Sequence, residues 1–225
     1  MENIKKNFYE LQAWEAGTLI IGVDEVGRGC LAGPVVAAAT MIHKGKKSPL
    51  IKDSKILTLE ERIKAFQWVI KNSTYGIGIV HNRLVDQKNI YQATKIAMKR
   101  AISQLLANTP IIPSAIVIDA VKLSLDNFQG PIHSFPFGES KSISIAAASI
   151  IAKVTRDRLM QEFEHDFPQY QLAQHKGYAT VSHRNHLKMH KICLIHRVSF
   201  VDHWEDALSA QNTIPFKQSS EKELS

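Results

Sequence analysis

The chain has 225 residues, 44% of them hydrophobic and 22% charged, a composition that suits one compact domain or one domain with a small appendage. No apolar run approaches the roughly 20 residues that span a bilayer, and the amino terminus is acidic rather than signal-like, so we expect a cytoplasmic protein without a membrane partner. The net charge of +7 favours nucleic acid as a partner, while Cys30 and Cys193, which lack CxxC spacing, indicate neither a disulfide framework nor a cysteine zinc site.

The first predicted elements are two strands joined by a charged corner, over residues 20–39 (IIGVDEVGRGCLAGPVVAAA). The first strand is apolar and ends at Asp24 and Glu25, which precede the Gly-Arg-Gly sequence of residues 27–29. Carboxylates at the end of an apolar strand must be paired, hydrated or bound to a cation, and a solvated acidic turn is the simplest alternative. Because consecutive strand residues point to opposite faces, we expect Glu25 to join Asp24 only if the strand ends there.

Helices and strands alternate over the next part of the chain. Thr58 and Glu61 have the spacing of a capping box, which predicts a helix that runs to about Asn72. A short strand over residues 75–80 and an amphipathic helix over residues 90–106 are predicted after it. The first of these helices is expected to bury four apolar side chains: Ile63, Phe66, Val69 and Ile70.

A second apolar strand, residues 115–119 (AIVID), also ends in a carboxylate, Asp119. If this strand is a parallel neighbour of the first, the two carboxyl ends lie side by side, which is where open α/β sheets place their sites. A turn residue or helix cap is the alternative for Asp119 taken alone.

A short strand over residues 132–135 and the sequence GESK at 138–141 precede a long helix of small residues over 142–163. One apolar stripe of this helix is expected to face the sheet. Its cations are expected nearer to solvent: Lys153, Arg156 and Arg158.

Residues 174–200 are dense in basic and aromatic side chains, and we interpret them as a nucleic-acid-facing surface. A zinc site on the helix face shared by His183, His186 and His190 is the alternative, although no carboxylate or cysteine completes the set at ligand spacing. Residues 1–200 are predicted to form the domain, and 201–225 a C-terminal helix and tail whose polar end is disordered. The side chains behind the surface interpretation are His175, Lys176, Tyr178, His183, Arg184, His186, Lys188, His190, Lys191, His196 and Arg197.

Several motifs follow one another between residues 19 and 200: DEVGRGCLAGPVVAAA from Asp24, DSKIL from Asp53, IDA from Ile118, GESKSISIAAASIIAKVTRDR from Gly138, HKGYAT from His175 and IHRVSF from Ile195. Together they resemble the type 2 ribonucleases H, and ribonuclease HII in particular. The resemblance implies a ribonuclease H-like α/β fold, with a mixed five-stranded sheet flanked by helices and a helical C-terminal extension.

The resemblance also implies a site with two divalent cations, Mg²⁺ or Mn²⁺, clamping the attacking and leaving oxygens of a phosphodiester. Asp24 and Asp119 are expected to bridge the cations, with Glu25 and Glu139 completing the catalytic and metal-binding set. Glu139 departs from the family, which more often has Asp at this position. The substrate-binding residues carried over by the resemblance are Gly27, Arg28, Gly29, Lys55, Lys176, Tyr178 and Arg197.

The implied function is an endonuclease that cuts the RNA strand of RNA–DNA hybrids and incises 5′ of ribonucleotides embedded in duplex DNA, leaving 3′-hydroxyl and 5′-phosphate ends. The alternatives are a ribonuclease HIII-like hybrid nuclease and a non-catalytic nucleic-acid-binding module on the same fold. Tyr178, and the 17 residues before Thr18 where ribonuclease HIII has a further domain, favour ribonuclease HII.

A last motif lies near the C-terminus. Residues 211–216 (QNTIPF) resemble the glutamine-aliphatic-aromatic peptides that dock on replication sliding clamps. A hydrophobic turn that folds back onto the domain is the alternative for this motif.

Overall fold

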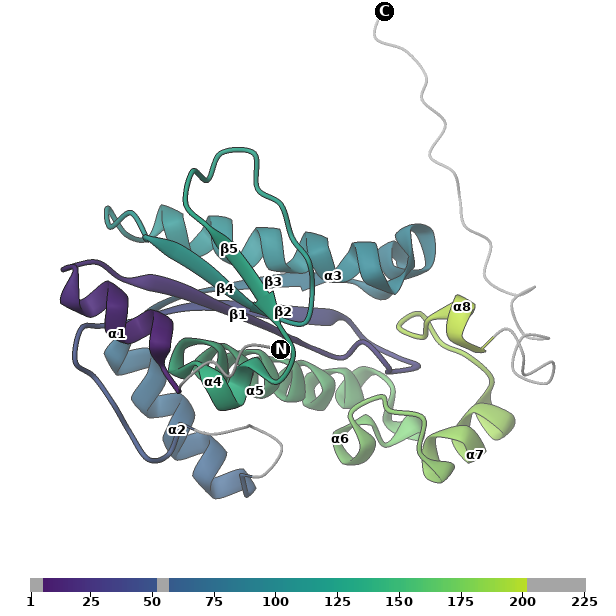
Figure 1. Ribbon diagram of the computed structural model, residues 1–225. Coiled ribbons are helices and arrows are strands. Elements are labelled where there is room, and N and C mark those ends of the chain that lie inside the picture. Colours follow the sequence, from purple (N-terminus) through teal and green to yellow (C-terminus); the bar gives the residue numbers. More distant parts are fainter. Residues whose placement is uncertain (1–5, 52–56, 202–225) are drawn as a thin grey trace, which may run out of the picture.

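The computed structural model describes residues 6–51 and 57–201, and its centre is a mixed five-stranded sheet with the strand order β3-β2-β1-β4-β5 (Figure 1). β1 pairs antiparallel with β2 and parallel with β4, while β2–β3 is antiparallel and β4–β5 is parallel. The five-stranded mixed sheet expected from the sequence is therefore confirmed. Its strands are β1 (Ile20–Val26), β2 (Val35–Ile42), β3 (Ser73–Val80), β4 (Ala115–Asp119) and β5 (Ile132–Phe135).

Helices cover both faces of this sheet (Figure 1). One face carries α3 (Asn82–Ala107), and the other carries α1 (Phe8–Glu15), α2 (Leu59–Asn72) and α5 (Ile143–Asp166). The small residues of the sheet permit this close packing, since a Cβ atom on Gly22 of β1 would lie only 2.2 Å from the backbone of Ser144 in α5. The start of α5 therefore rests directly on the strand that carries Asp24.

The capping box predicted for α2 is present: Glu61 donates its backbone N–H to Thr58 Oγ1 at 3.2 Å, and Thr58 donates its own to Glu61 Oε2 at 2.9 Å. The predicted buried stripe is confirmed for Val69 and, in part, for Phe66, which packs against the core, but it is wrong for Ile63 and Ile70, which are exposed. The helix buries Ala65 and Val69, which are four residues apart and so lie on one face.

The helix predicted from residue 90 is the second part of α3. Asn89 interrupts α3 with a φ of 62°, and its side-chain oxygen accepts a hydrogen bond from the backbone N–H of Gln92 at 3.1 Å. Asn89 thus caps a new helical segment, which explains why the apolar periodicity in the sequence begins at Ile90.

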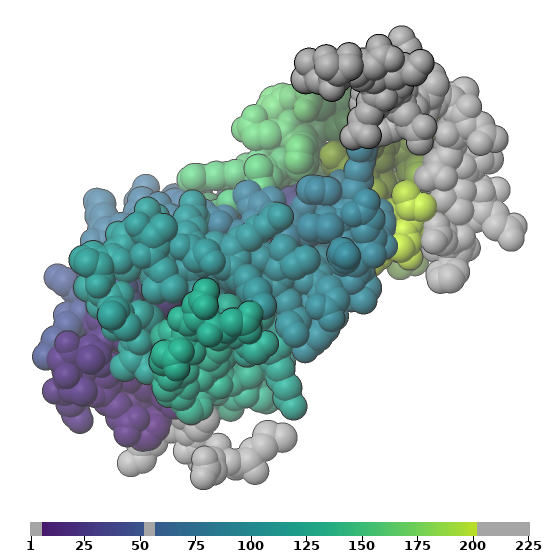
Figure 2. All heavy atoms as spheres, turned by 90° about the horizontal axis from the view of Figure 1, so that it is seen from above, coloured from purple at the N-terminus to yellow at the C-terminus, as the bar shows by residue number. Residues whose placement is uncertain are grey.

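A helical C-terminal extension follows α5, at the end of the molecule far from α1 (Figure 2). It contains a 3₁₀ turn (Pro168–Tyr170), α6 (Leu172–His175), α7 (Val181–His190) and α8 (Val198–Val201). A separate hydrophobic cluster packs the extension against Leu31 and Ala32 of the β1–β2 connection. Its other buried members are Met160, Tyr170, Leu172, Leu187, Ile195 and Val201.

The sequence predictions for residues beyond 201, including the last helix and the disordered end, lie outside the described residues. The division of the chain at residue 200 stays a prediction. Within residues 6–51 and 57–201, no helix combines the length and the apolar character that crossing a membrane requires.

Candidate active site

Four carboxylates line one cavity of about 290 Å³ at the carboxyl ends of β1 and β4. Asp24 and Glu25 come from β1, Asp119 is the last residue of β4, and Glu139 lies in the short helix α4 (Gly138–Lys141). The topology brings them together because β1 and β4 are parallel neighbours. The remaining wall residues are Val26, Ser149, Lys153 and Tyr178.

Glu25 reaches the cavity although β1 does not end before it. β1 stays paired with β2 as far as Val26, so the expectation that the strand ends at Glu25 is wrong. The ladder to β4, however, has its last pair at Val23 and Ile118. Asp24 and Glu25 both lie beyond that pair, and both line the cavity.

The carboxylates at the end of β1 are buried close to one another. Asp24 is 5% exposed, and burial raises its pKa well above the ordinary value, with further increases from the negative charges of Glu25, Glu139 and Asp119. Burial also raises the pKa of Glu25, while the Arg28 guanidinium, 3.1 Å from Glu25 Oε1, opposes that increase. The cavity therefore concentrates negative charge that is costly to keep ionised.

Glu139 and Asp119 are joined through the backbone of α4. Asp119 Oδ1 accepts a hydrogen bond from the backbone N–H of Gly138 at 2.9 Å, and Glu139 Oε1 accepts one from the Ser149 hydroxyl. A Cβ atom on Gly138 would lie 2.7 Å from Ile145, so glycine permits this close turn. Glu139 is itself buried, with 8% of its surface exposed.

The donor set fits hard divalent cations, because it consists of carboxylate oxygens. Glu25 Oε2 is buried and has no hydrogen-bond partner among the described residues, as expected of an oxygen that a cation would contact. Within residues 6–51 and 57–201, no three His, Cys, Asp or Glu side chains are already grouped around one point as metal ligands. Binding would therefore require the carboxylates to turn towards a shared ion.

The Gly-Arg-Gly corner approaches this cavity closely. Gly27 has a φ of 91°, and a Cβ atom there would lie 2.2 Å from Arg156 Nε. Arg156 is fully buried under the corner and donates to the carbonyls of Pro34 at 2.9 Å, Ala32 at 3.0 Å and Lys176 at 2.8 Å. The expectation that Arg156 lies nearer to solvent is therefore wrong.

Tyr178 stands at the rim of the cavity, 38% exposed. Its backbone forms a β-bridge with Cys30, and Leu31 donates its N–H to the carbonyl of Gly177 at 2.8 Å. Lys153 Nζ lies 5.8 Å from the centre of the Tyr178 ring. The fold thus places the aromatic ring beside the Gly-Arg-Gly corner and the carboxylates.

A family model described as Ribonuclease HII matches residues 21–203 of this chain. The chain belongs to the ribonuclease HII family. Membership makes it an endonuclease of the ribonuclease H type.

Solved structures share its fold. The ribonuclease H2 from Pyrococcus horikoshii OT3 is 24% identical, with a TM-score of 0.66 over 84% of this chain and 95% of that chain. A structure of the PCNA:RNase HII complex from Archaeoglobus fulgidus matches with 24% identity and a TM-score of 0.61, over 76% and 87%. Bst-RNase HIII in complex with Mn²⁺ matches with 21% identity and a TM-score of 0.62, over 80% and 64%.

The sequence places Arg197 of this ribonuclease HII family member at the substrate, but the structure places its side chain inside the protein. Its side chain is fully buried, and burial lowers its pKa to about 10. The guanidinium donates to the carbonyl of Arg28 at 2.8 Å and twice to that of Gly33, at 3.1 and 2.9 Å. Arg197 therefore holds the Gly-Arg-Gly corner from inside, while the Arg28 side chain stays 41% exposed beside Glu25.

The other described residues of this ribonuclease HII family member that were predicted to contact nucleic acid are also partly buried and partly exposed. Lys176 is half-buried, its ammonium donates to the carbonyl of Ala173, and burial lowers its pKa. Lys55 lies outside the described residues. In the basic segment, His175, His183 and His196 are buried rather than surface residues. Its exposed cations include Arg184 and Lys188.

Two polar residues of the cavity wall, Ser149 and Lys153, were not assigned to the site from the sequence. Ser149 bonds Glu139, and Lys153 pairs with Asp157 at 2.8 Å. Both belong to the GESKSISIAAASIIAK motif, about two and about three turns along α5 from its buried start, so the motif contained the signal.

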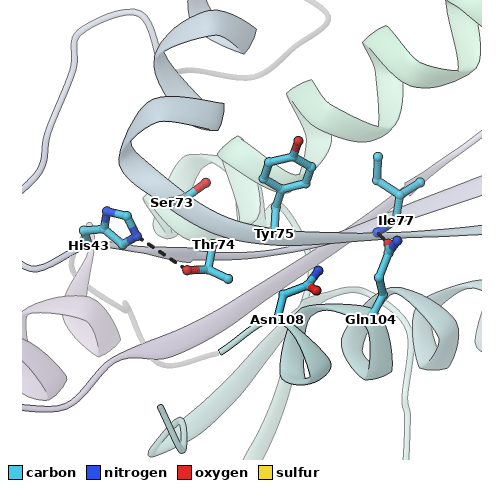
Figure 3. Close-up of a pocket in the computed structure, with 7 residues that line it drawn as sticks. All are labelled: His43, Ser73, Thr74, Tyr75, Ile77, Gln104 and Asn108. Carbon is cyan, nitrogen blue, oxygen red and sulfur yellow. Dashed lines mark hydrogen bonds between the residues drawn. The ribbon is translucent and has the colours of Figure 1, made fainter. Parts of the chain in front are cut away.

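A larger cavity, of about 550 Å³, lies at the other end of the sheet (Figure 3). His43 follows β2 there and approaches Thr74 Oγ1 of β3 at 3.5 Å, and the backbone N–H of Ile77 donates to Gln104 Oε1 at 2.5 Å. No carboxylate lines this cavity. Size alone therefore does not locate the site, whereas the grouping of carboxylates does.

Proposed function

We propose that this chain hydrolyses the RNA strand of RNA–DNA hybrids and incises on the 5′ side of single ribonucleotides embedded in duplex DNA, leaving 3′-hydroxyl and 5′-phosphate ends. The observation that carries the proposal is the single cavity lined by Asp24, Glu25, Asp119 and Glu139 with Tyr178 at its rim. Membership of the ribonuclease HII family supports the same chemistry.

The four carboxylates would hold two divalent cations, Mg²⁺ or Mn²⁺, which when bound stabilise the charge on the attacking and leaving oxygens of the phosphodiester. The similar Bst-RNase HIII was solved in complex with Mn²⁺, which supports a divalent cation as the cofactor. Asp24 and Asp119, from the adjacent strands, would be the central ligands of the cations. The Ser149 hydroxyl orients Glu139. Arg28 orients Glu25, whose other oxygen, Oε2, has no hydrogen-bond partner among the described residues.

The backbone at Gly27, Arg28 and Gly29 together with Tyr178 would recognise the junction between a ribonucleotide and DNA. The 2′-hydroxyl is the local group that distinguishes RNA from DNA, and glycines let backbone groups approach it without an intervening side chain. The exposed Tyr178 ring can stack on the adjoining sugar or base. Recognition of this kind requires one 2′-hydroxyl rather than a run of them.

The test is a gel-resolved comparison of two duplexes, one with a single ribonucleotide and one a long RNA–DNA hybrid, each with Mg²⁺, with Mn²⁺ and with a chelator. We expect metal-dependent cutting of both, and cutting on the 5′ side of the single ribonucleotide. Tyr178→Ala should weaken cutting of the single-ribonucleotide duplex more than that of the hybrid, where several registers offer contacts.

The same assay separates the alternatives. A wild-type protein that cuts the hybrid but ignores the single ribonucleotide contradicts junction recognition and favours the ribonuclease HIII-like activity. Binding of both duplexes without cleavage in either metal contradicts the catalytic proposal and favours a nucleic-acid-binding module.

We also propose that residues 211–216 dock on a replication sliding clamp. The order of Gln211, Ile214 and Phe216 supports this, as does the similarity to a structure of the PCNA:RNase HII complex. In a pull-down, the cognate clamp should retain the wild-type protein but not the Phe216→Ala variant. Retention of the variant at the wild-type level would contradict the proposal.

A further inference from the structure

Three buried histidines lie next to the backbone of residues 177 and 178, and none of them lines the carboxylate cavity. His175 and His183 stack with ring centroids 4.1 Å apart, and His183 Nε2 lies 3.1 Å from His196 Nε2. The exposed fractions of the three residues are 8%, 0% and 2%. Histidines this deeply buried need a defined set of donors and acceptors.

The backbone partners determine which nitrogen of each ring carries the proton. His183 Nδ1 faces the carbonyl of Tyr178 at 2.9 Å, so this nitrogen must be the donor and Nε2 the acceptor. His196 Nε2 must then donate to His183 Nε2. This agrees with the other side of the His196 ring, where Nδ1 accepts the backbone N–H of Cys193 at 2.9 Å.

His175 is fixed in the same manner. Its Nδ1 accepts the backbone N–H of Gly177 at 3.1 Å, so its Nε2 donates to the carbonyl of Tyr170 at 2.7 Å. Every nitrogen of the three rings then has one role, and all three rings are neutral. Burial lowers the pKa of His183 to about 4 and that of His196 to about 3, in agreement with the neutral rings.

The network connects the segments that carry Tyr178. His196 forms a β-bridge with Ala32, and Cys30 forms one with Tyr178. The chain of donors therefore runs from the backbone of Cys193 through two imidazoles to the carbonyl of Tyr178. This carbonyl also accepts the backbone N–H of Thr180 at 2.8 Å, so the backbone of Tyr178 is held in place at the position from which its ring lines the cavity.

We propose that His183 and His196 are positioning residues for substrate selection: their proton-ordered chain fixes the carbonyl of Tyr178 and so sets the Tyr178 ring at the rim of the carboxylate cavity. The inference rests on the proposed role of Tyr178 in junction recognition. It adds that the selection of a single ribonucleotide depends on two residues that no substrate touches.

Paired substitutions of His183 test the chain. His183→Asn keeps a donor at the position of Nδ1, whereas His183→Gln keeps only the position of Nε2 and loses the bond to Tyr178. The readout is the ratio of kcat/KM for the single-ribonucleotide duplex to that for the long hybrid. We expect His183→Gln to lower this ratio about tenfold, mainly through KM, and His183→Asn to leave it within about twofold of wild type.

His196 supplies a second, independent pair. His196→Gln keeps a donor at the position of Nε2, and His196→Asn keeps only the acceptor for the Cys193 N–H. The ratio should fall for His196→Asn and be retained by His196→Gln. His165→Gln is the matched control, since His165 is exposed near the end of α5, outside residues 174–200, and should leave both kcat/KM values unchanged.

Circular dichroism and thermal melting establish whether each variant is folded. If His183→Gln does not fold, the two His196 variants test the inference in its place. Equal loss of selectivity in both members of a pair overturns the inference, as does an unchanged ratio in folded His183→Gln. Tyr178→Ala separates the role of Tyr178 from that of the histidines. If Tyr178→Ala leaves the ratio unchanged, the proposed role of Tyr178 in junction recognition is wrong. If Tyr178→Ala changes the ratio but the His183 and His196 variants do not, only the positioning role of the histidines is overturned.

Discussion

Two regions on either side of Tyr178 bury ionisable side chains, and they do so in opposite ways. In the carboxylate cavity, Asp24 lies among like charges and Glu25 Oε2 has no hydrogen-bond partner among the described residues. Beneath the ring, Arg156 and Arg197 direct their guanidinium groups at backbone carbonyls. Buried charge that its surroundings leave unsatisfied indicates a place for a ligand, whereas buried charge with satisfied donors indicates support.

The same contrast distinguishes Arg28 from Arg197, which the sequence predicts to have the same role. Arg28 is 41% exposed and pairs with a carboxylate of the cavity, while Arg197 is fully buried and donates to the backbone of that same corner. Residue type and basic surroundings suggest nucleic-acid contact for both. Only the tertiary contacts separate a side chain facing substrate from one that holds the corner in place.

The largest expected effect is that of Asp24→Asn. Metal-dependent cleavage should fall at least about 10³-fold, because a proposed central ligand of the cations is lost. In the absence of metal, the same change should raise the melting temperature by roughly 2–4 °C, because it removes a buried negative charge whose pKa is raised by burial and by neighbouring carboxylates. A calorimetric melt and a cleavage assay on one preparation measure both. A lower melting temperature without metal would break the comparison.

Arg197→Met should lower stability, whereas Asp24→Asn should raise it. It leaves the carbonyls of Arg28 and Gly33 without their donor, so we expect the free energy of unfolding to fall by about 3–5 kcal/mol in urea titration. Arg28→Met, the matched substitution at the exposed position, should change stability by less than about 1 kcal/mol. Equal effects of the two substitutions would remove the distinction between the arginines.

The histidines predict how stability depends on pH. His183 and His196 have pKa values of about 4 and about 3 when folded, against 6.5 for an ordinary histidine, so the unfolded chain binds their protons first. Their contribution is therefore fully present above about pH 6.5 and is lost as the pH falls towards 4, by up to about 1.4 kcal/mol per pH unit for each ring. Urea titrations of wild type and His183→Asn over this range should differ in slope. Parallel pH profiles would show that His183 is not held neutral.

The smallest effect concerns the length of Glu139. Because Ser149 orients its carboxylate and the side chain lies at the edge of the set, Glu139→Asp should keep cleavage within about tenfold of wild type. Glu139→Gln should lose more, since it removes the charge at unchanged length. An alanine variant with wild-type kinetics would exclude Glu139 from the site.

Local signals in the sequence predict much of the fold. The capping box of Thr58 and Glu61 and the apolar runs that became β4 and β5 need only short-range chemistry, and the structure has them at the predicted residues. The four carboxylates were identified from the motifs, and the parallel pairing of β1 with β4 brings them to one cavity.

The interior of the C-terminal extension could not be predicted in this way. Helical periodicity places a cation such as Arg156 towards solvent, but the carbonyls that surround it belong to residues 32–34 and to Lys176, which meet α5 only in the folded chain. His183 likewise shares a helix face with His186 in the sequence, yet its partner is His196, from the following loop. Side chains that satisfy distant backbone groups have no local pattern.

Metal binding in the absence of substrate tests the central claim most directly. Thermal melts of wild type, Asp24→Asn and Asp119→Asn with increasing Mg²⁺ or Mn²⁺ report binding to the folded state. At about 100 times the dissociation constant, the wild-type melting temperature should rise by roughly 5–10 °C, and that of both variants should stay nearly constant. An unchanged wild-type melt, or the same rise in Asp24→Asn, would contradict the account that the carboxylates of this cavity form the metal site.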